Sequence, residues 1–145
     1  MTLHLIKLCV GCDSVRDLED WIRQTRKEKR QRGRKPEHIH RTRMVPKRAG
    51  ELTGGGSLYW VIRGEIACRQ RLLDIRPFRD KNGVGRCALV LDPKVVLVEP
   101  RPHRAFQGWR YLVAKDAPRD LEKAAPGAAA MPETMRRELR ELGLM

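Results

Sequence analysis

The sequence predicts an α+β protein built on a small antiparallel β-barrel with flanking helices. Two observations carry this prediction. A long helical segment near the N-terminus is followed, from residue 57 to residue 112, by short segments rich in β-branched and aromatic residues. Hairpin turn signals such as Asn82–Gly83 separate these segments. Consecutive strands joined by hairpins favour an antiparallel sheet that curls into a barrel.

The first elements are a strand and a helix. Residues 2–10 are rich in Leu, Ile and Val and predict a buried strand. Ser14 is expected to cap the following helix, with Asp17 at its third position as in a capping box. The apolar stripe of this helix ends at Ile22, and the polar residues beyond it predict an end that projects into solvent or lies on a partner. Gly33 and Pro36 are expected to stop the helix.

The middle of the chain predicts one short helix and then the strands. Pro46 suits the first turn of the short helix, which ends before the glycine run at 54–56. The expected strands are 59–62, 66–75, two short ones on either side of Asp92–Pro93, and a last one through RAFQGWRYL with a kink at Gly108.

The chain is expected to form one domain over residues 1–123, because its 145 residues suffice for a single core. Residues 124–131 are rich in Ala and predict a linker. Residues 132–145 predict an amphipathic helix that places Met135, Leu139 and Leu142 on one face.

Several classes of protein are excluded or disfavoured by composition. The sequence has no run of about 18 apolar residues, so no membrane span and no membrane partner are expected. The apolar N-terminal run lacks the cleavage site of a signal peptide. We therefore expect a cytoplasmic protein.

Positive charge is concentrated in two blocks of the sequence. The formal net charge is +13. Residues 23–48 hold twelve Lys and Arg against two Glu, and residues 60–111 hold eleven against five Asp and Glu. Such clustering is typical of a protein that binds a polyanion, and the excess of Arg suits bidentate phosphate contacts. A solubilising surface is the alternative explanation.

The four cysteines are expected to be free thiols in a reducing compartment. Cys9 and Cys12 form a Cys-x-x-Cys pair, but no second such pair completes a zinc site. A redox pair is the other alternative, although the surrounding pattern of a thioredoxin is missing. No metal and no cofactor are predicted. The glycine run at 54–56 lacks the Lys and Ser/Thr of a phosphate loop and predicts a tight turn.

His38 and His40 would share one face of a strand, as metal ligands often do. They stand among Arg and Lys, whose field opposes a bound cation, so phosphate contact or plain solvation is expected. No pairing of carboxylates or nucleophile with base is evident in the sequence. Whether the protein is an enzyme stays open.

The stretch RPHRAFQGWRYL, residues 101–112, interleaves arginines with aromatic residues. This mixture suits a platform that stacks bases and clamps phosphates. The alternative is that the aromatic residues belong to the core while the arginines point outward. The predicted nucleic-acid-binding residues are Arg41, Arg43, Lys47, Arg48, Arg101, His103, Arg104, Phe106, Trp109 and Arg110.

Three segments resemble a bacterial family of short basic proteins described only as a domain of unknown function: LHLIKLCVGCDSVRDL, TRMVPKRAGELTGGGSLYWVIRG and ALVLDPKVVLVEPRPHRAFQGWRYL. PKRAGELTGGG, SLYWVIRG and GEIACRQRLLDI are also similar to the PUA-like barrels, including the ASCH and EVE branches. The basic insert at 23–35 departs from that pattern. The PUA-like resemblance implies a barrel fold and RNA binding.

The sequence therefore predicts a protein that binds nucleic acid, most simply RNA, through a basic surface and a stacking face made by Trp109 and Phe106. Two alternatives stay open. One is an enzyme that acts on a nucleotide or modified base in a barrel pocket, using His103 or the Arg101 and Arg104 pair. The other is a protein-interaction module that uses the C-terminal helix. The oligomeric state is not specified by the sequence.

Overall fold

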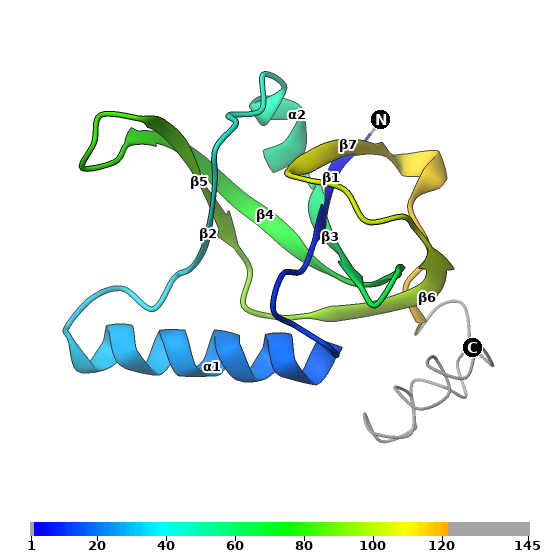
Figure 1. The fold of residues 1–145 in the computed structure, drawn as a ribbon, viewed down its shortest axis with the longest axis horizontal. Coiled ribbons are helices and arrows are strands. Elements are labelled where there is room, and N and C mark those ends of the chain that lie inside the picture. Colours follow the sequence, from blue (N-terminus) through cyan, green and yellow to red (C-terminus); the bar gives the residue numbers. More distant parts are fainter. Residues whose placement is uncertain (1, 122–145) are drawn as a thin grey trace.

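The computed structural model describes residues 2–121, which form two helices and a seven-stranded mixed sheet (Figure 1). The elements are β1 (Leu3–Leu8), α1 (Val15–Gln31), β2 (His38–Thr42), α2 (Ala49–Thr53), β3 (Ser57–Ile62), β4 (Glu65–Arg79), β5 (Gly85–Leu91), β6 (Val96–Pro102) and β7 (Trp109–Val113), followed by a 3₁₀ turn at Ala114–Asp116. The α+β class is confirmed. The predicted linker at 124–131 and helix at 132–145 lie outside the described residues.

The sheet differs from the predicted antiparallel barrel in two ways. Its strand order is β2-β5-β4-β3-β1-β7, with β6 also paired to β4. β1 and β3 run parallel, whereas every other pair of strands is antiparallel. Over residues 2–121 no pairing joins the edge strands β2 and β7, so the sheet is mixed and stays open. The long strand β4 connects the two parts of the sheet, because its first part pairs with β3 and β6 and its second part pairs with β5.

α1 begins where the sequence predicts. The Oγ of Ser14 accepts a hydrogen bond from the backbone N of Asp17 at 3.2 Å, and the Asp17 carboxylate accepts one from the backbone N of Asp13 at 3.0 Å. Three apolar residues in its first turns, Val15, Leu18 and Ile22, are buried. The polar C-terminal half is held beside β2 by side chains that donate to the following loop (Figure 1).

β1 and β7 carry a core on each face of the sheet. Successive residues of a strand point to opposite faces. Leu5 and Trp109 belong to one cluster, which also holds Trp60 and the buried side of α1. Ile6 and Leu112 belong to a second cluster on the other face. A side chain of β7 can therefore pack only against the core cluster on its own face of the sheet.

Glycine is required at residue 56, between α2 and β3. A Cβ at Gly56 would lie 2.2 Å from the carbonyl oxygen of Leu3 and 2.5 Å from that of Leu52. The chain passes too close to these backbone atoms for any side chain. The glycine run is thus a tight turn into a strand, as predicted. In the same described part of the chain, no helix is long and apolar enough to cross a membrane.

Candidate functional site

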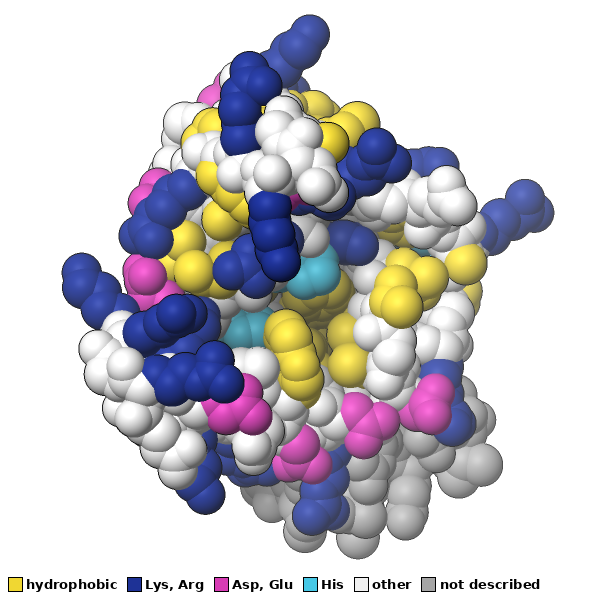
Figure 2. Space-filling model, turned by 60° about the vertical axis from the view of Figure 1, so that its left-hand side comes forward, with side chains coloured by type: hydrophobic (Ala, Val, Ile, Leu, Met, Phe, Trp, Pro, Cys, Tyr) yellow, Lys and Arg dark blue, Asp and Glu magenta, His cyan; other side chains and the backbone are white. Residues whose placement is uncertain are grey.

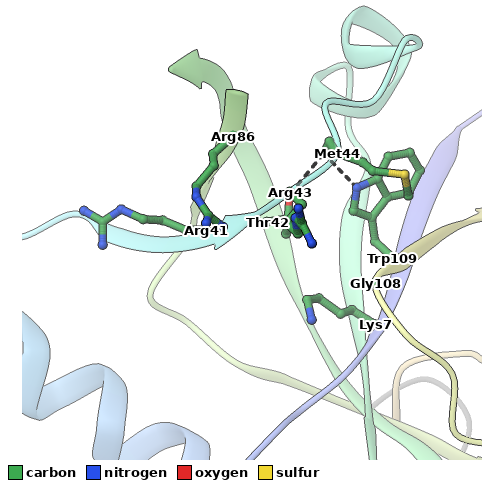
Figure 3. Close-up of a pocket in the computed structure, with 8 residues that line it drawn as sticks. All are labelled: Lys7, Arg41, Thr42, Arg43, Met44, Arg86, Gly108 and Trp109. Atoms are coloured by element: carbon green, nitrogen blue, oxygen red, sulfur yellow. Dashed lines mark hydrogen bonds between the residues drawn. The ribbon is translucent and has the colours of Figure 1, made fainter. Parts of the chain in front are cut away.

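Cations from three strands surround a cavity of about 270 Å³ at the end of β2, here called the basic pocket. Its lining residues are Lys7, Arg41, Thr42, Arg43, Met44, Arg86, Gly108 and Trp109. Figure 3 shows the side chains of Lys7 and Arg43 beside the Trp109 indole, while the guanidinium of Arg41 extends away from them. The lining residues come from segments that are far apart in the sequence and that the folded sheet brings together.

Most of the positive charge in the basic pocket is not neutralised. Arg86 pairs with Asp80 at 2.6 Å. Lys7, Arg41 and Arg43 have no carboxylate within ion-pair distance among residues 2–121. Burial lowers the pKa of Lys7, because a charged ammonium loses hydration there. An anion entering the pocket would relieve these unpaired charges.

Trp109 is mainly a core residue that contributes one wall of the basic pocket. It is 9 % exposed and packs in the same cluster as Trp60. Its Nε1 donates to the carbonyl oxygen of Met44 at 2.9 Å, which ties β7 to the loop after β2. The ring of Tyr111 meets it edge-on, with 5.0 Å between centroids. The indole is therefore fixed in place by packing and one hydrogen bond.

Phe106 lies apart from Trp109. It packs, half-buried, against the second core cluster, and the Arg110 guanidinium lies 4.7 Å from its ring centroid. The prediction that Phe106 and Trp109 form one stacking face is wrong. The reason is that Arg110 and Trp109 are neighbours in a strand and so point to opposite faces of the sheet.

The other predicted residues of this stretch surround the loop before β7. Arg101 and Arg104 are exposed, and Arg101 donates to the carbonyl oxygen of Asp116 at 2.5 Å. His103 is half-buried, and its ring contacts that of Phe106 edge-on, 5.1 Å between centroids. These residues form a second basic surface, separate from the basic pocket.

Lys47 and Arg48 lie on the loop before α2, and both are exposed. Arg48 forms an ion pair with Glu51, and its backbone N donates to the hydroxyl of Tyr111 at 3.2 Å. Its charge is thus partly neutralised. Of the predicted cations, Arg41 and Arg43 are the two that line the basic pocket together with Trp109.

A second cavity, of about 380 Å³, lies next to the basic pocket and was missed by the sequence reasoning. We call it the aromatic pocket; its lining residues are Lys7, Cys9, Val10, Gly11, Cys12, Leu18, Trp21, His40 and Trp60. Figure 2 shows this side of the molecule as a hollow with a hydrophobic floor, histidine in its wall and Lys and Arg along one side. Trp21 follows Leu18 at helical spacing, as a residue of the buried stripe would, yet it is 46 % exposed. No local signal in the sequence tells whether a tryptophan at this position is buried or exposed.

The histidines of β2 are not solvated as predicted. His38 is 1 % exposed and meets the Trp21 ring edge-on at 5.0 Å, and His40 meets Trp60 in the same way at 5.1 Å. Burial is the main cause that lowers the pKa of each to about 4, so both rings are neutral at pH 7. The Nε2 atoms of both lack a hydrogen-bond partner in the described part of the protein.

The cysteines are free thiols, as predicted. Cys9 is buried, and burial raises its pKa, so it stays protonated at neutral pH. Within residues 2–121, no three His, Cys, Asp or Glu side chains are arranged to hold a metal ion.

Comparison with other proteins supplies a family. No curated protein and no solved structure matches the chain. The family model described as "Protein of unknown function (DUF1489)" matches residues 5–145, and the chain therefore belongs to that family.

Proposed function

We propose that this protein binds nucleic acid, with RNA the favoured partner, through the basic pocket. The observation that carries the proposal is a group of cations around one cavity beside the Trp109 indole: Lys7, Arg41 and Arg43, none of which pairs with a carboxylate among residues 2–121. Phosphate oxygens would complete the hydrogen bonds of the two guanidinium groups, which suit bidentate contacts.

The charge around the pocket favours a polymer over a single small anion. Burial lowers the pKa of the Lys29 ammonium on α1, and the positive charge of Arg41 lowers it further. Lys29 therefore lies near Arg41. Basic side chains thus continue from the basic pocket along the C-terminal half of α1. A row of phosphates would contact such a surface at several points. The resemblance of SLYWVIRG and its neighbours to PUA-like RNA-binding barrels supports RNA.

The second basic surface would make secondary contacts. β7 is an edge strand, so an RNA strand leaving the basic pocket can pass around it to the other face of the sheet. There it would meet Arg101, His103, Arg104 and Arg110, with Phe106 beneath Arg110. On the near side, Lys47 and Arg48 flank the path.

The test is the salt dependence of binding to a short, fluorescein-labelled single-stranded RNA, followed by anisotropy. Affinity should fall steeply between about 50 and 200 mM salt, by about three-hundred-fold if six phosphates of the single strand are contacted. Arg41→Ala with Arg43→Ala should reduce the slope of log affinity against log salt by about 1.4, or about 0.7 for each lost phosphate contact.

Lys81→Ala with Lys94→Ala is the matched control, because both lysines are exposed and neither lines the basic pocket or the aromatic pocket of about 380 Å³. This pair removes the same formal charge and should leave the slope nearly unchanged. Equal slopes in the two double variants would place the interface elsewhere. Absence of any RNA binding at low salt would overturn the proposed function.

A further inference from the structure

The aromatic pocket has the size and the walls of a site for one flat organic ring. Its volume of about 380 Å³ lies near the lower end of the range of about 300–1,000 Å³ found for small-ligand sites. The exposed indole of Trp21 stands on one side, and the buried Trp60 and Leu18 lie deeper. Tryptophan is highly buried on average and is enriched at interfaces, so a half-exposed indole beside a cavity is a candidate contact for a ligand.

One polar group in this pocket has no hydrogen-bond partner among residues 2–121. The Nε2 of His40 is buried and makes no hydrogen bond to any described residue. Buried polar atoms in native proteins are nearly always paired, so this nitrogen calls for a ligand atom or water. A neutral imidazole offers one donor and one acceptor, and the edge of a nucleobase carries both kinds of group.

The position of Lys7 connects this pocket with the proposed phosphate site. Its side chain lines the aromatic pocket and the basic pocket alike. Figure 2 shows Lys and Arg gathered above and to the left of the hollow, while Asp and Glu line its lower edge and also stand among the basic side chains at the left. This asymmetry would keep a phosphate on the basic side and leave the hollow for an uncharged ring.

We propose that the aromatic pocket binds one unstacked nucleobase, with Trp21 against the ring, His40 at its edge and Lys7 on its phosphate. The proposal rests on the proposed function and adds to it the part of the nucleic acid that enters the protein. A base within a strand and a free nucleotide share this chemistry, so both are used as probes.

The experiment compares three ligands: a short oligoadenylate RNA, an abasic ribose-phosphate chain of the same length, and AMP. Trp21→Ala should weaken oligoadenylate binding by about 5- to 150-fold, the effect of losing one stacked base. Binding of the abasic chain should not change, because its contacts are with phosphate only. Leu73→Ala is the control, since Leu73 is also a half-exposed apolar residue and lines neither pocket.

A second variant guards against loss of structure. Trp21→Phe retains an aromatic face and should recover most of the oligoadenylate affinity. If Trp21→Ala weakens the oligoadenylate and the abasic chain equally, or weakens neither, the nucleobase site is refuted while RNA binding stands.

The AMP probe separates the two proposals. If wild-type protein binds neither chain but binds AMP, and Trp21→Ala abolishes that binding, then the nucleic-acid function fails and the nucleobase site is supported. If none of the three ligands binds, both proposals are overturned.

Discussion

The free energy of unfolding should fall as the pH is lowered from 6.5 to 4, because the fold buries His38. Burial, followed by the charges of Lys29 and Arg26, lowers the pKa of this imidazole from 6.5 to about 4. Between these two pH values the unfolded chain therefore binds more protons than the folded protein does. The contribution of His38 to the free energy of unfolding is fully present above about pH 6.5 and is lost progressively as the pH falls to about 4. Below about pH 4 this contribution does not change further.

The size of the loss follows from the two pKa values of His38. At about 1.36 kcal/mol for each pH unit, a pKa that moves from 6.5 to about 4 corresponds to a loss of about 3 kcal/mol. Burial also lowers the pKa of His40 to about 4, so this imidazole should add a loss of similar size over the same pH window. Small domains are stable by only about 5–15 kcal/mol, so the effect should be easy to measure.

The assay is urea unfolding, followed by tryptophan fluorescence, at pH values of about 7, 5.5 and 4.5. His38→Phe keeps an aromatic ring against Trp21 and removes the titrating group. Its free energy of unfolding should fall by about 3 kcal/mol less than that of the wild type over the window from pH 6.5 to 4. Carboxylates such as Glu37, whose pKa is lowered by Arg76, lose their contribution mainly at lower pH and in both proteins alike. The same pH dependence in variant and wild type would refute the argument.

Two further predictions concern Trp109 and the cysteine pair. Trp109→Ala should lower the free energy of unfolding by about 3–5 kcal/mol in urea titrations, because it empties a core position and removes the hydrogen bond from Nε1 to the Met44 carbonyl, which then keeps only the bond from the Thr42 hydroxyl. Unchanged stability with weakened RNA binding would instead support the stacking role. Cys9→Ala with Cys12→Ala should give a folded protein whose metal content, by elemental analysis, equals that of the wild type. Stoichiometric zinc in the wild type that the double variant lacks would contradict this.

Local features of the chain were predictable because they depend on neighbouring residues. Ser14 and Asp17 form the helix cap through bonds that span three residues, and the apolar spacing up to Ile22 sets the buried side of α1. The turn at Asn82–Gly83 likewise joins β4 to β5 as expected, with Gly83 at φ +75°. The clustering of Lys and Arg is a property of composition, and it already pointed to a polyanion.

The candidate site was predicted in part. Arg41 and Arg43 were chosen from the charge of their segment, and both line the basic pocket. Lys7 and Arg86 were not chosen, because each stands in a strand whose own pattern gives no reason to select it. The aromatic pocket was missed altogether, since Trp21 has the spacing of a core residue.

Tertiary structure decided the rest through one arrangement of strands. β1 lies between β3 and β7, parallel to the first and antiparallel to the second, and this brings Lys7 opposite Trp109. Strand pairing between distant segments is set by how the whole sheet buries its two cores, which no local pattern encodes. The same arrangement separates Phe106 from Trp109, because alternate residues of a strand face opposite ways. The sequence alone thus determined the charge, the helix cap and the hairpin turns, and the packing of the sheet determined which of the charged and aromatic residues share a pocket.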